Sequence, residues 1–166
     1  EGKNAVAKDV VAKEGAKYIF DGATLLLDGS STVRRLIKYL DPYKSLKIIT
    51  NNHEIFSELE NEKITVYSTG GRFDPQNKIF LGSTAEEYVR NVSADILFFS
   101  SQAISEDGEI SDVSEEETSL RRVMLSRAKK KIFLCDSSKL GLEKTFRLCS
   151  KNDVDVIICD EKLPWE

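Results

Sequence analysis

The chain has 166 residues, of which 40% are hydrophobic and 31% charged, and its formal net charge is −4. This length is enough for one α/β domain with a sizeable core, and the acidic balance disfavours a domain that grips nucleic-acid phosphates. No stretch approaches the roughly 20 apolar residues of a membrane helix, and no signal peptide opens the chain. The three cysteines form neither a CxxC pair nor a zinc-binding pattern, which indicates free thiols in a reducing cytoplasm.

Hydrophobic periodicity predicts alternating helices and strands over the first half of the chain. Pro42 is expected to end the second helix, because proline cannot continue one. The predicted elements are a helix over residues 3–14, a strand over 24–27, a helix with Val33, Leu36, Ile37 and Leu40 on one face, a strand over 46–50, a helix that Asn51 caps, and a strand over 64–67.

The same alternation continues in the second half. Ser83 and Ser114 each begin a capping-box pattern, with a glutamate three residues later. The predicted elements are a helix that Ser83 opens, a strand over 96–99, a loop over 104–113, a helix that Ser114 opens and that extends to Ala128, and strands over 132–135 and 154–159.

Helices that alternate with strands imply a Rossmann-like α/β fold, with a mainly parallel sheet and helices on both faces. Residues 1–166 are predicted to form a single domain, since no linker, repeat or low-complexity tract interrupts them. Ligands bind at the carboxyl ends of the strands in such sheets. The candidate binding loops are therefore those that begin at Asp28, Thr50, Ser68, Ser100 and Asp136.

The strongest local signal is the loop Asp28-Gly29-Ser30-Ser31-Thr32, which leaves a strand and enters an amphipathic helix. Small residues let the backbone approach a ligand, and the free amides and hydroxyls at a helix start favour an anion such as phosphate. The alternative is a well-capped helix without a ligand, because Ser, Thr and Asp are preferred caps. The loop matches neither a Walker motif nor a GxGxxG fingerprint, so nucleotide binding is not indicated.

Other strand ends also carry polar or glycine residues, each with a structural alternative. Thr50 and Asn51 offer donors to a ligand, or Asn51 simply caps the next helix. Gly70 and Gly71 allow a tight turn that needs no ligand. Lys139, in the segment Asp-Ser-Ser-Lys after an apolar strand, either reaches a bound phosphate or stays solvated.

The sequence offers few side chains for catalysis or metal binding. His53 is the only histidine and has no carboxylate partner in its segment, so it is expected on the surface. With one histidine and scattered cysteines, no metal site and no cofactor are expected. A basic cluster of Arg121, Arg122, Arg127 and residues 129–131 is expected at the end of a helix, on a solvated face.

Taken in order, these segments resemble the C-terminal sensor domain of the DeoR family of bacterial repressors. Each segment is weakly specific alone, but the ordered set covers essentially the whole chain. The segments that carry the resemblance are residues 28–32, 50–51, 70–71, 82, 94–95, 117–124, 136–139 and 156–160.

The resemblance implies a fold shared with ribose phosphate isomerase and glucosamine phosphate deaminase, and a phosphorylated sugar or glycolytic intermediate as the effector. It also implies homo-oligomerisation. A winged helix-turn-helix module is expected to precede this domain in the full-length protein, to be absent from this chain, and to make the DNA contacts. The candidate effector-binding residues are Asp28, Gly29, Ser30, Ser31, Thr32, Thr50, Asn51, Gly70, Gly71, Gln102, Glu117, Arg121 and Lys139.

The chain departs from the family pattern within this candidate site. Ser30 stands where the family usually has glycine, which changes how closely the backbone approaches a phosphate. Gln102 is larger than the family's small residues after the fourth strand, which changes the sugar that fits. Arg121 stands where lysine is frequent, and it offers a planar fork in place of a point charge.

Three functions compete at this level: a non-catalytic sensor that changes the operator binding of a repressor of sugar metabolism, a sugar-phosphate isomerase or deaminase of the same fold, and a plain association domain. The enzymes move a proton next to a carbonyl and need a positioned base. Asp28 and Glu117 are the only acids to nominate, and neither has an obvious general-acid partner. The sequence therefore favours the sensor.

Overall fold

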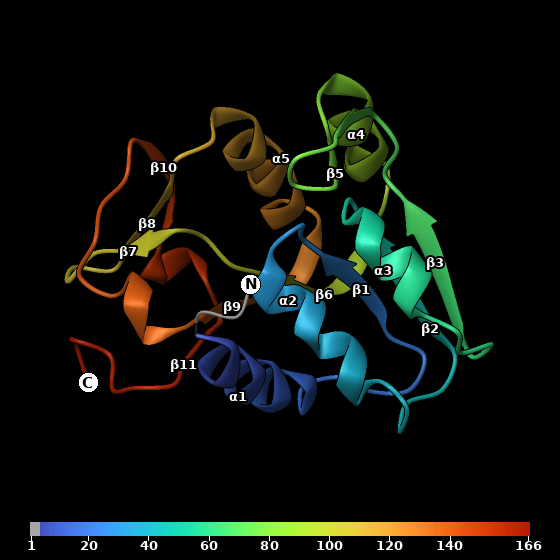
Figure 1. The fold of residues 1–166 in the computed structure, drawn as a ribbon, viewed down its shortest axis with the longest axis horizontal. Helices are drawn as coiled ribbons and strands as arrows, with labels where there is room; N and C mark the ends of the chain where they lie inside the picture. Colours follow the sequence, from blue (N-terminus) through green and yellow to red (C-terminus); the bar gives the residue numbers. More distant parts are fainter. Residues whose placement is uncertain (1–3) are drawn as a thin grey trace.

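Helices and strands alternate along the computed structural model, which describes residues 4–166 (Figure 1). The helices are α1 (Ala5–Ala16), α2 (Ser31–Arg34), α3 (His53–Glu58), α4 (Ser83–Arg90) and α5 (Glu115–Leu125), with the 3₁₀ helices η1 (Arg35–Tyr39), η2 (Ser137–Lys139) and η3 (Lys151–Asp153). The strands are β1 (Thr24–Leu27), β2 (Leu46–Thr50), β3 (Ile64–Ser68), β4 (Arg72–Asp74), β5 (Ile79–Leu81), β6 (Ala94–Phe99), β7 (Ala103–Ile104), β8 (Glu109–Asp112), β9 (Ala128–Cys135), β10 (Phe146–Ser150) and β11 (Val156–Cys159). Residue 3, where the first helix was expected to begin, lies outside the described residues.

A parallel sheet forms the centre of the domain. Within residues 4–166 it has six strands in the order β11-β9-β6-β1-β2-β3, accompanied by a three-stranded antiparallel sheet, β10-β8-β7, and a β4-β5 hairpin. Every pairing in the six-stranded sheet is parallel. Helices cover both faces of this sheet (Figure 1). The predicted Rossmann-like α/β fold is therefore confirmed.

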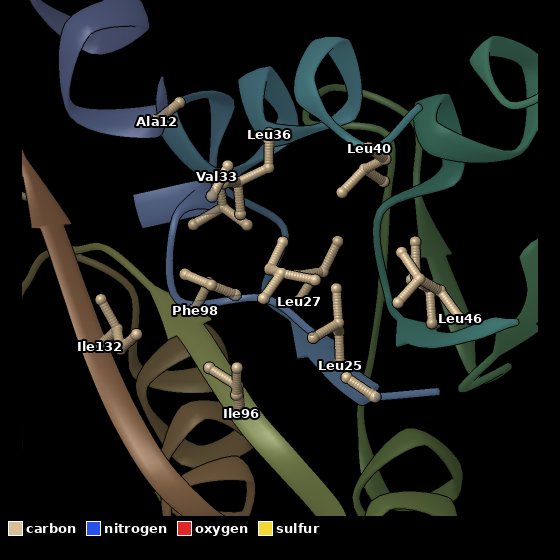
Figure 2. Close-up of a cluster of buried hydrophobic side chains, with 14 of the residues drawn as sticks. Ala12, Leu25, Leu27, Val33, Leu36, Leu40, Leu46, Ile96, Phe98 and Ile132 are labelled. Carbon is tan, nitrogen blue, oxygen red and sulfur yellow. The ribbon is translucent and has the colours of Figure 1, made fainter. Parts of the chain in front are cut away.

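The core has two layers, one on each face of the sheet. Successive side chains of a strand point to opposite faces, so Leu25 and Leu27 join one layer while Leu26 joins the other. α1, α2, η1 and α3 pack on the first face, and α4 and α5 pack on the second. In the first layer, Val33 and Leu36 lie over Leu25 and Leu27 (Figure 2). The central strands β1 and β6 are thus buried on both sides, as continuous apolar runs favour, whereas the edge strand β3 is partly exposed.

The strand order reverses between β1 and β6. From β1 the chain runs outward to β2 and β3, while on the other side the order continues through β6, β9 and β11. The loops after β1 and β6 therefore turn away from each other and leave a crevice at the carboxyl ends of these two strands, where ligands of such sheets bind.

The helix expected over Val33 to Leu40 differs from the prediction in its winding. It consists of the short α2 followed by the 3₁₀ helix η1, as is frequent where a short helix ends. The predicted apolar face is correct, because Val33, Leu36 and Leu40 are each at most 1% exposed.

The three-stranded sheet β10-β8-β7 was not predicted from the sequence. Residues 104–113 were expected to form a loop, but this segment contains the end of β7 and all of β8, and β10 was not predicted. Ala128 and the basic residues 129–131 belong to β9, not to the end of a helix. β7, β8 and β10 are only 2, 4 and 5 residues long, and β10 pairs with the distant β8, so local periodicity gave little signal for them.

Helix caps were predicted within one residue of their positions. Asn52, not Asn51, caps α3, since its side chain accepts a hydrogen bond from Glu54 N (3.0 Å). Gly82, not Ser83, is the N-cap residue of α4 and makes no side-chain bond. Ser114 is confirmed as the N-cap of α5, because its Oγ accepts from Glu117 N at 3.2 Å. The reciprocal bond of a capping box is replaced, since Ser114 N donates to Asp112 Oδ1 at 3.3 Å.

Candidate functional site

A cavity of about 270 Å³ opens where the loops after β1, β6 and β9 meet the start of α5. It lies at the reversal of strand order between β1 and β6, the position at which this class of sheet binds ligands. Hydroxyl, amide, carboxylate and cationic side chains line it, with Ile79 as an apolar member. The lining is therefore suited to a small polar ligand.

The loop after β1 folds around the carboxylate of Asp28, which is 1% exposed. Its Oδ1 accepts hydrogen bonds from Ser30 N (3.0 Å) and Ser30 Oγ (2.6 Å), and Ser30 Oγ accepts one from Val33 N (3.2 Å). Gly29 passes so close to Ile79 that a Cβ would lie 2.6 Å from Ile79 Cγ2. The loop therefore caps α2 and lines the cavity at the same time. Because α2 has only four residues, its side chains, rather than a long helix dipole, determine what it can bind.

Arg121 lines the cavity from within a buried cluster of carboxylates and is not on the solvated face expected from the sequence. Its side chain is 6% exposed, and Nε donates to Asp28 Oδ2 at 2.8 Å. Nη1 donates to Asp112 Oδ2 at 3.4 Å, and Nη2 lies 3.7 Å from Glu117 Oε1. The Ser100 backbone N–H also donates to Asp28 Oδ2. The guanidinium thus ties the loops after β1 and β8 to α5.

Burial and charge act on this cluster in opposite directions. Burial alone lowers the pKa of Arg121, but the charges of Asp28, Asp112 and Glu117 outweigh it and hold the pKa above its ordinary value. Burial raises the pKa of Glu117, and Arg121 offsets this only in part. Arg121 is therefore charged but already shared among carboxylates, so an anionic ligand needs other cations.

Lys139 of η2 lies at the cavity with its charge free of carboxylates. Its Nζ donates to Gln102 Oε1 at 3.2 Å, and among residues 4–166 no ion pair joins it to a carboxylate. Arg34 also lines the cavity, but Glu54 at 3.2 Å and Glu58 at 2.8 Å hold its guanidinium. Lys139 is thus better placed than Arg34 to accept a new anionic partner.

The part of the chain that the structure describes shows no arrangement for histidine catalysis in the cavity, metal binding or membrane insertion. His53 is exposed, as expected, and its ring lies 5.2 Å from that of Phe73 and 6.1 Å from that of Phe80, outside the cavity. Within the described residues no group of three or more His, Cys, Asp or Glu side chains is placed to hold a metal ion. Over the same residues, no helix combines the length and apolar character needed to cross a membrane.

A family model described as the DeoR C terminal sensor domain matches residues 3–161, which is nearly the whole chain. The chain belongs to this family. The transcriptional repressor GlcR of Bacillus subtilis is 31% identical over 158 residues, which cover 95% of this chain and 60% of GlcR. The sensor domain spans between 60% and 64% of the length of the first relatives that it matches, all of them transcriptional regulators.

Solved structures share the fold of the sensor domain. The delta subunit of eIF2B from Chaetomium thermophilum has a TM-score of 0.68 at 18% identity, over 95% of this chain and 56% of that one. Ribose 5-phosphate isomerase from Methanocaldococcus jannaschii has a TM-score of 0.60 at 19% identity, over 83% of this chain and 55% of that one. The expected likeness to ribose phosphate isomerase is therefore confirmed at the level of the fold.

Most of the candidate residues named from the sequence meet at the cavity of the sensor domain. Asp28 lies beneath the lining and holds both the loop after β1 and Arg121. Those that line the cavity are Gly29, Ser30, Ser31, Thr32, Gln102, Glu117, Arg121 and Lys139.

The remaining candidates do not line it and have structural contacts instead. Thr50 Oγ1 accepts a hydrogen bond from Asn52 N (3.0 Å), and Asn51 Nδ2 donates to Phe80 O (3.0 Å). Gly70 and Gly71 both have positive φ. Gly71 passes so close to β5 that a Cβ would lie 2.7 Å from the Leu81 carbonyl oxygen. Asn51 and Gly71 therefore pack against β5, and Ile79 of this strand lines the cavity.

Several cavity residues were missed, some because they come from segments that carry no motif of their own and others because they only adjoin the residues named in the predicted binding loops. Lys8 lies on α1, more than 20 residues before the β1 loop that it contacts, and Asp112 ends a strand that was expected to be a loop. The residues missed are Lys8, Arg34, Asn52, Glu54, Asn77, Ile79, Ser101 and Asp112.

Proposed function

We propose that this sensor domain binds a phosphorylated sugar or glycolytic intermediate in the cavity, and that binding changes how a full-length repressor holds its operator. The domain itself is proposed to be non-catalytic. The contacts with DNA belong to the expected N-terminal winged helix-turn-helix module, and homo-oligomers of the sensor domain set the spacing of two such modules, because half-site spacing is strict.

The observation that carries this proposal is a lysine without a carboxylate partner beside a group of hydroxyls. Among residues 4–166, the ammonium group of Lys139 has one hydrogen-bond partner, the neutral amide oxygen of Gln102, and it shares the cavity with Ser30, Ser31 and Thr32. An ammonium group and hydroxyl donors are a common set of ligands for a phosphate monoester. The carboxylates and amides of the same lining offer hydrogen bonds to sugar hydroxyls.

The comparisons support the same ligand class. The fold is that of an isomerase whose name states a sugar phosphate substrate, and the relatives are transcriptional regulators that exceed this chain in length. A sensor that keeps the sugar-phosphate cavity of such a fold, and that is joined to a DNA-binding module, accounts for both similarities.

An isomerase or deaminase is the second candidate, and Glu117 is the observation in its favour. This side chain lines the cavity, and burial raises its pKa, as general acid–base catalysis requires. Against it, Asp28 and Asp112 are both bound to Arg121, and His53 is outside the cavity. A sensor needs no proton transfer, so it fits this arrangement better.

A thermal-shift panel of glucose 6-phosphate, fructose 1,6-bisphosphate and ribose 5-phosphate, with glucose and ribose as unphosphorylated controls, tests the proposal. We expect at least one phosphorylated sugar to raise the melting temperature while its unphosphorylated partner does not, with no conversion of that sugar detected by NMR. Turnover would establish the enzyme instead, and a flat panel would leave a domain without a sugar-phosphate site.

The variant Lys139→Ala is expected to weaken binding of the active sugar phosphate about ten- to a hundredfold, because a charge-assisted hydrogen bond contributes roughly 1.5–3 kcal/mol. Isothermal titration calorimetry measures the change. Lys144→Ala is the matched control, since Lys144 is exposed and lies outside the cavity. Equal affinities for the two variants would place Lys139 in solvent.

A further inference from the structure

Two cysteines that lie 24 residues apart in the sequence meet at the ends of neighbouring strands. Cys135 is the last residue of β9 and Cys159 the last residue of β11, and the parallel pairing of these strands places the two residues in register. Their side chains therefore leave the sheet on the same face, and both pack in the core layer of α4 and α5. Both are free thiols, hydrogen-bonded to each other.

The spacing of the strands allows a bond between the two sulfur atoms. Neighbouring strands of a sheet lie about 4.7–4.9 Å apart, and the Cα atoms of a disulfide are usually about 4.4–6.8 Å apart. In-register partners such as Cys135 and Cys159 fall within this range. The backbone of β9 and β11 can therefore accommodate a disulfide at this position.

The two thiols differ in their access to solvent and in their ease of ionisation. Cys135 is completely buried, whereas Cys159, on the outermost strand of the sheet, is half-buried. The hydrogen bond between the thiols lowers the pKa of Cys159, and the same bond together with burial raises the pKa of Cys135. The thiolate is the form that reacts with peroxides. Cys159 is thus placed to react first, with Cys135 behind it as its partner.

The pair also lies directly beneath the segment that carries Lys139 to the cavity. One residue after Cys135 the chain enters η2, and Lys139 is the last residue of that helix. On the other strand, Asp160 follows Cys159, and its carboxylate accepts hydrogen bonds from Ser137 N (2.7 Å) and Ser137 Oγ (3.3 Å). Both thiols are therefore connected to η2, one through the chain and one through Asp160.

We propose that Cys135 and Cys159 form a redox-active dithiol, which hydrogen peroxide oxidises to a disulfide, and that the disulfide weakens effector binding by displacing η2 from the cavity. The effect on binding rests on the proposed sugar-phosphate function, whereas the oxidation does not. The sensor domain would in this way respond to two signals, the sugar phosphate in the cavity and the peroxide at the end of β11.

The oxidation proceeds in two balanced steps. The Cys159 thiolate attacks one oxygen of hydrogen peroxide, the O–O bond breaks, and the departing hydroxide takes a proton to become water, which leaves a sulfenic acid on Cys159. The sulfur of Cys135 then attacks the Cys159 sulfur, the S–O bond breaks, and the second hydroxide leaves as water with the proton of Cys135. Two thiols and one peroxide thus give one disulfide and two waters.

The direct test treats reduced residues 1–166 with hydrogen peroxide and maps the cysteine peptides by mass spectrometry without reduction. The free thiols should fall from three to one, with Cys135 linked to Cys159, and dithiothreitol should restore all three. Cys149 should remain a thiol, because burial raises its pKa to about 12. Three remaining thiols, or a bond through Cys149 or to a second chain, would overturn the proposal.

Calorimetry with the panel sugar phosphate that gives the largest thermal shift is the second readout. Oxidised wild type should bind it about threefold or more weakly than reduced wild type, because Lys139 is displaced. Peroxide should leave the affinity of Cys159→Ser unchanged, and Cys149→Ser is the matched control that should respond like wild type. Equal affinities of the reduced and disulfide forms, or a wild-type response in Cys159→Ser, overturn the inference and leave the proposed function intact. Absence of binding to reduced wild type overturns the proposed function, and the peptide map still decides whether the dithiol is oxidised.

Discussion

Arg121 lines the cavity, and it also connects two segments that are far apart in the sequence. Its guanidinium donates to Asp28 and Asp112, which come from segments 84 residues apart in the sequence. Both carboxylates are at most 3% exposed. A planar fork can serve two acceptors at once, whereas the lysine that is frequent at this position in the family would supply a point charge. Arg121 therefore fixes the positions of the Asp28 and Asp112 side chains at the cavity. We expect it to act on ligand binding mainly through the loops that these two residues belong to.

Removing this guanidinium should be costly. Arg121→Met leaves two buried carboxylates without their cation, and breaking such a cluster destabilises a protein by about 3–5 kcal/mol. Urea denaturation followed by circular dichroism measures the loss. The matched control is Arg90→Met, whose ion pairs with Glu86 and Glu87 lie on a side chain that is 51% exposed; its cost should stay below about 1 kcal/mol. Similar costs for the two variants would contradict the structural role of Arg121.

Among the elements, those that follow local periodicity were predicted well. Leu25, Leu26 and Leu27 form a continuous apolar run, and the structure buries all three completely. The strand at residues 96–99 was recognised by the same signal, and it begins only slightly earlier, at Ala94. The loops after both strands were among the five candidate binding loops named from the sequence, because ligands bind at the carboxyl ends of parallel strands. The sequence did not reveal that the order of the sheet reverses between these two strands.

Elements whose identity depends on distant partners were not predicted. β8 is a strand because β7 and β10 flank it, and its residues Glu109 and Ser111 carry no apolar alternation with their neighbours that would reveal it. Lys8 was missed for a related reason, since nothing in the local sequence of α1 indicates that its first half reaches the loop after β1. Contacts between segments far apart in the sequence decide both cases.

Gly70 and Gly71 were candidate effector-binding residues, but neither lines the cavity, and their backbone conformation has a structural explanation. Both have positive φ, which costs an alanine about 1–2 kcal/mol. Gly71→Ala should cost more than Gly70→Ala, because only at Gly71 would the new Cβ meet a backbone oxygen, that of Leu81, at 2.7 Å. Urea denaturation measures this difference.

Neither of these two variants should change the affinity for a sugar phosphate as long as it is folded, since neither glycine lines the cavity. Calorimetry below the melting temperature checks this point. Loss of binding in folded Gly71→Ala would restore the effector-binding role that was expected from the sequence.

At the scale of the whole molecule, every α-helix of residues 4–166 is needed to cover the sheet. α1, α2 and α3 bury side chains in one core layer, and α4 and α5 bury side chains in the other. A helix that reads DNA must instead be free to enter the major groove. Lys129 and Lys130 are exposed at the start of β9, but a strand inside a parallel sheet cannot follow a groove.

The described domain should therefore have no operator affinity of its own at physiological salt. Its net charge of −4 opposes the phosphate neutralisation on which non-specific binding depends, and the exposed acids Glu106, Asp107, Glu115 and Glu116 add local repulsion. An electrophoretic mobility assay with residues 1–166, with and without the active sugar phosphate, should show no retarded operator fragment in either case. A full-length regulator carrying the proposed winged helix-turn-helix should retard the same fragment. Sequence-specific retardation by residues 1–166 alone would mean that the sensor domain itself contacts DNA, and the two-module mechanism would fail.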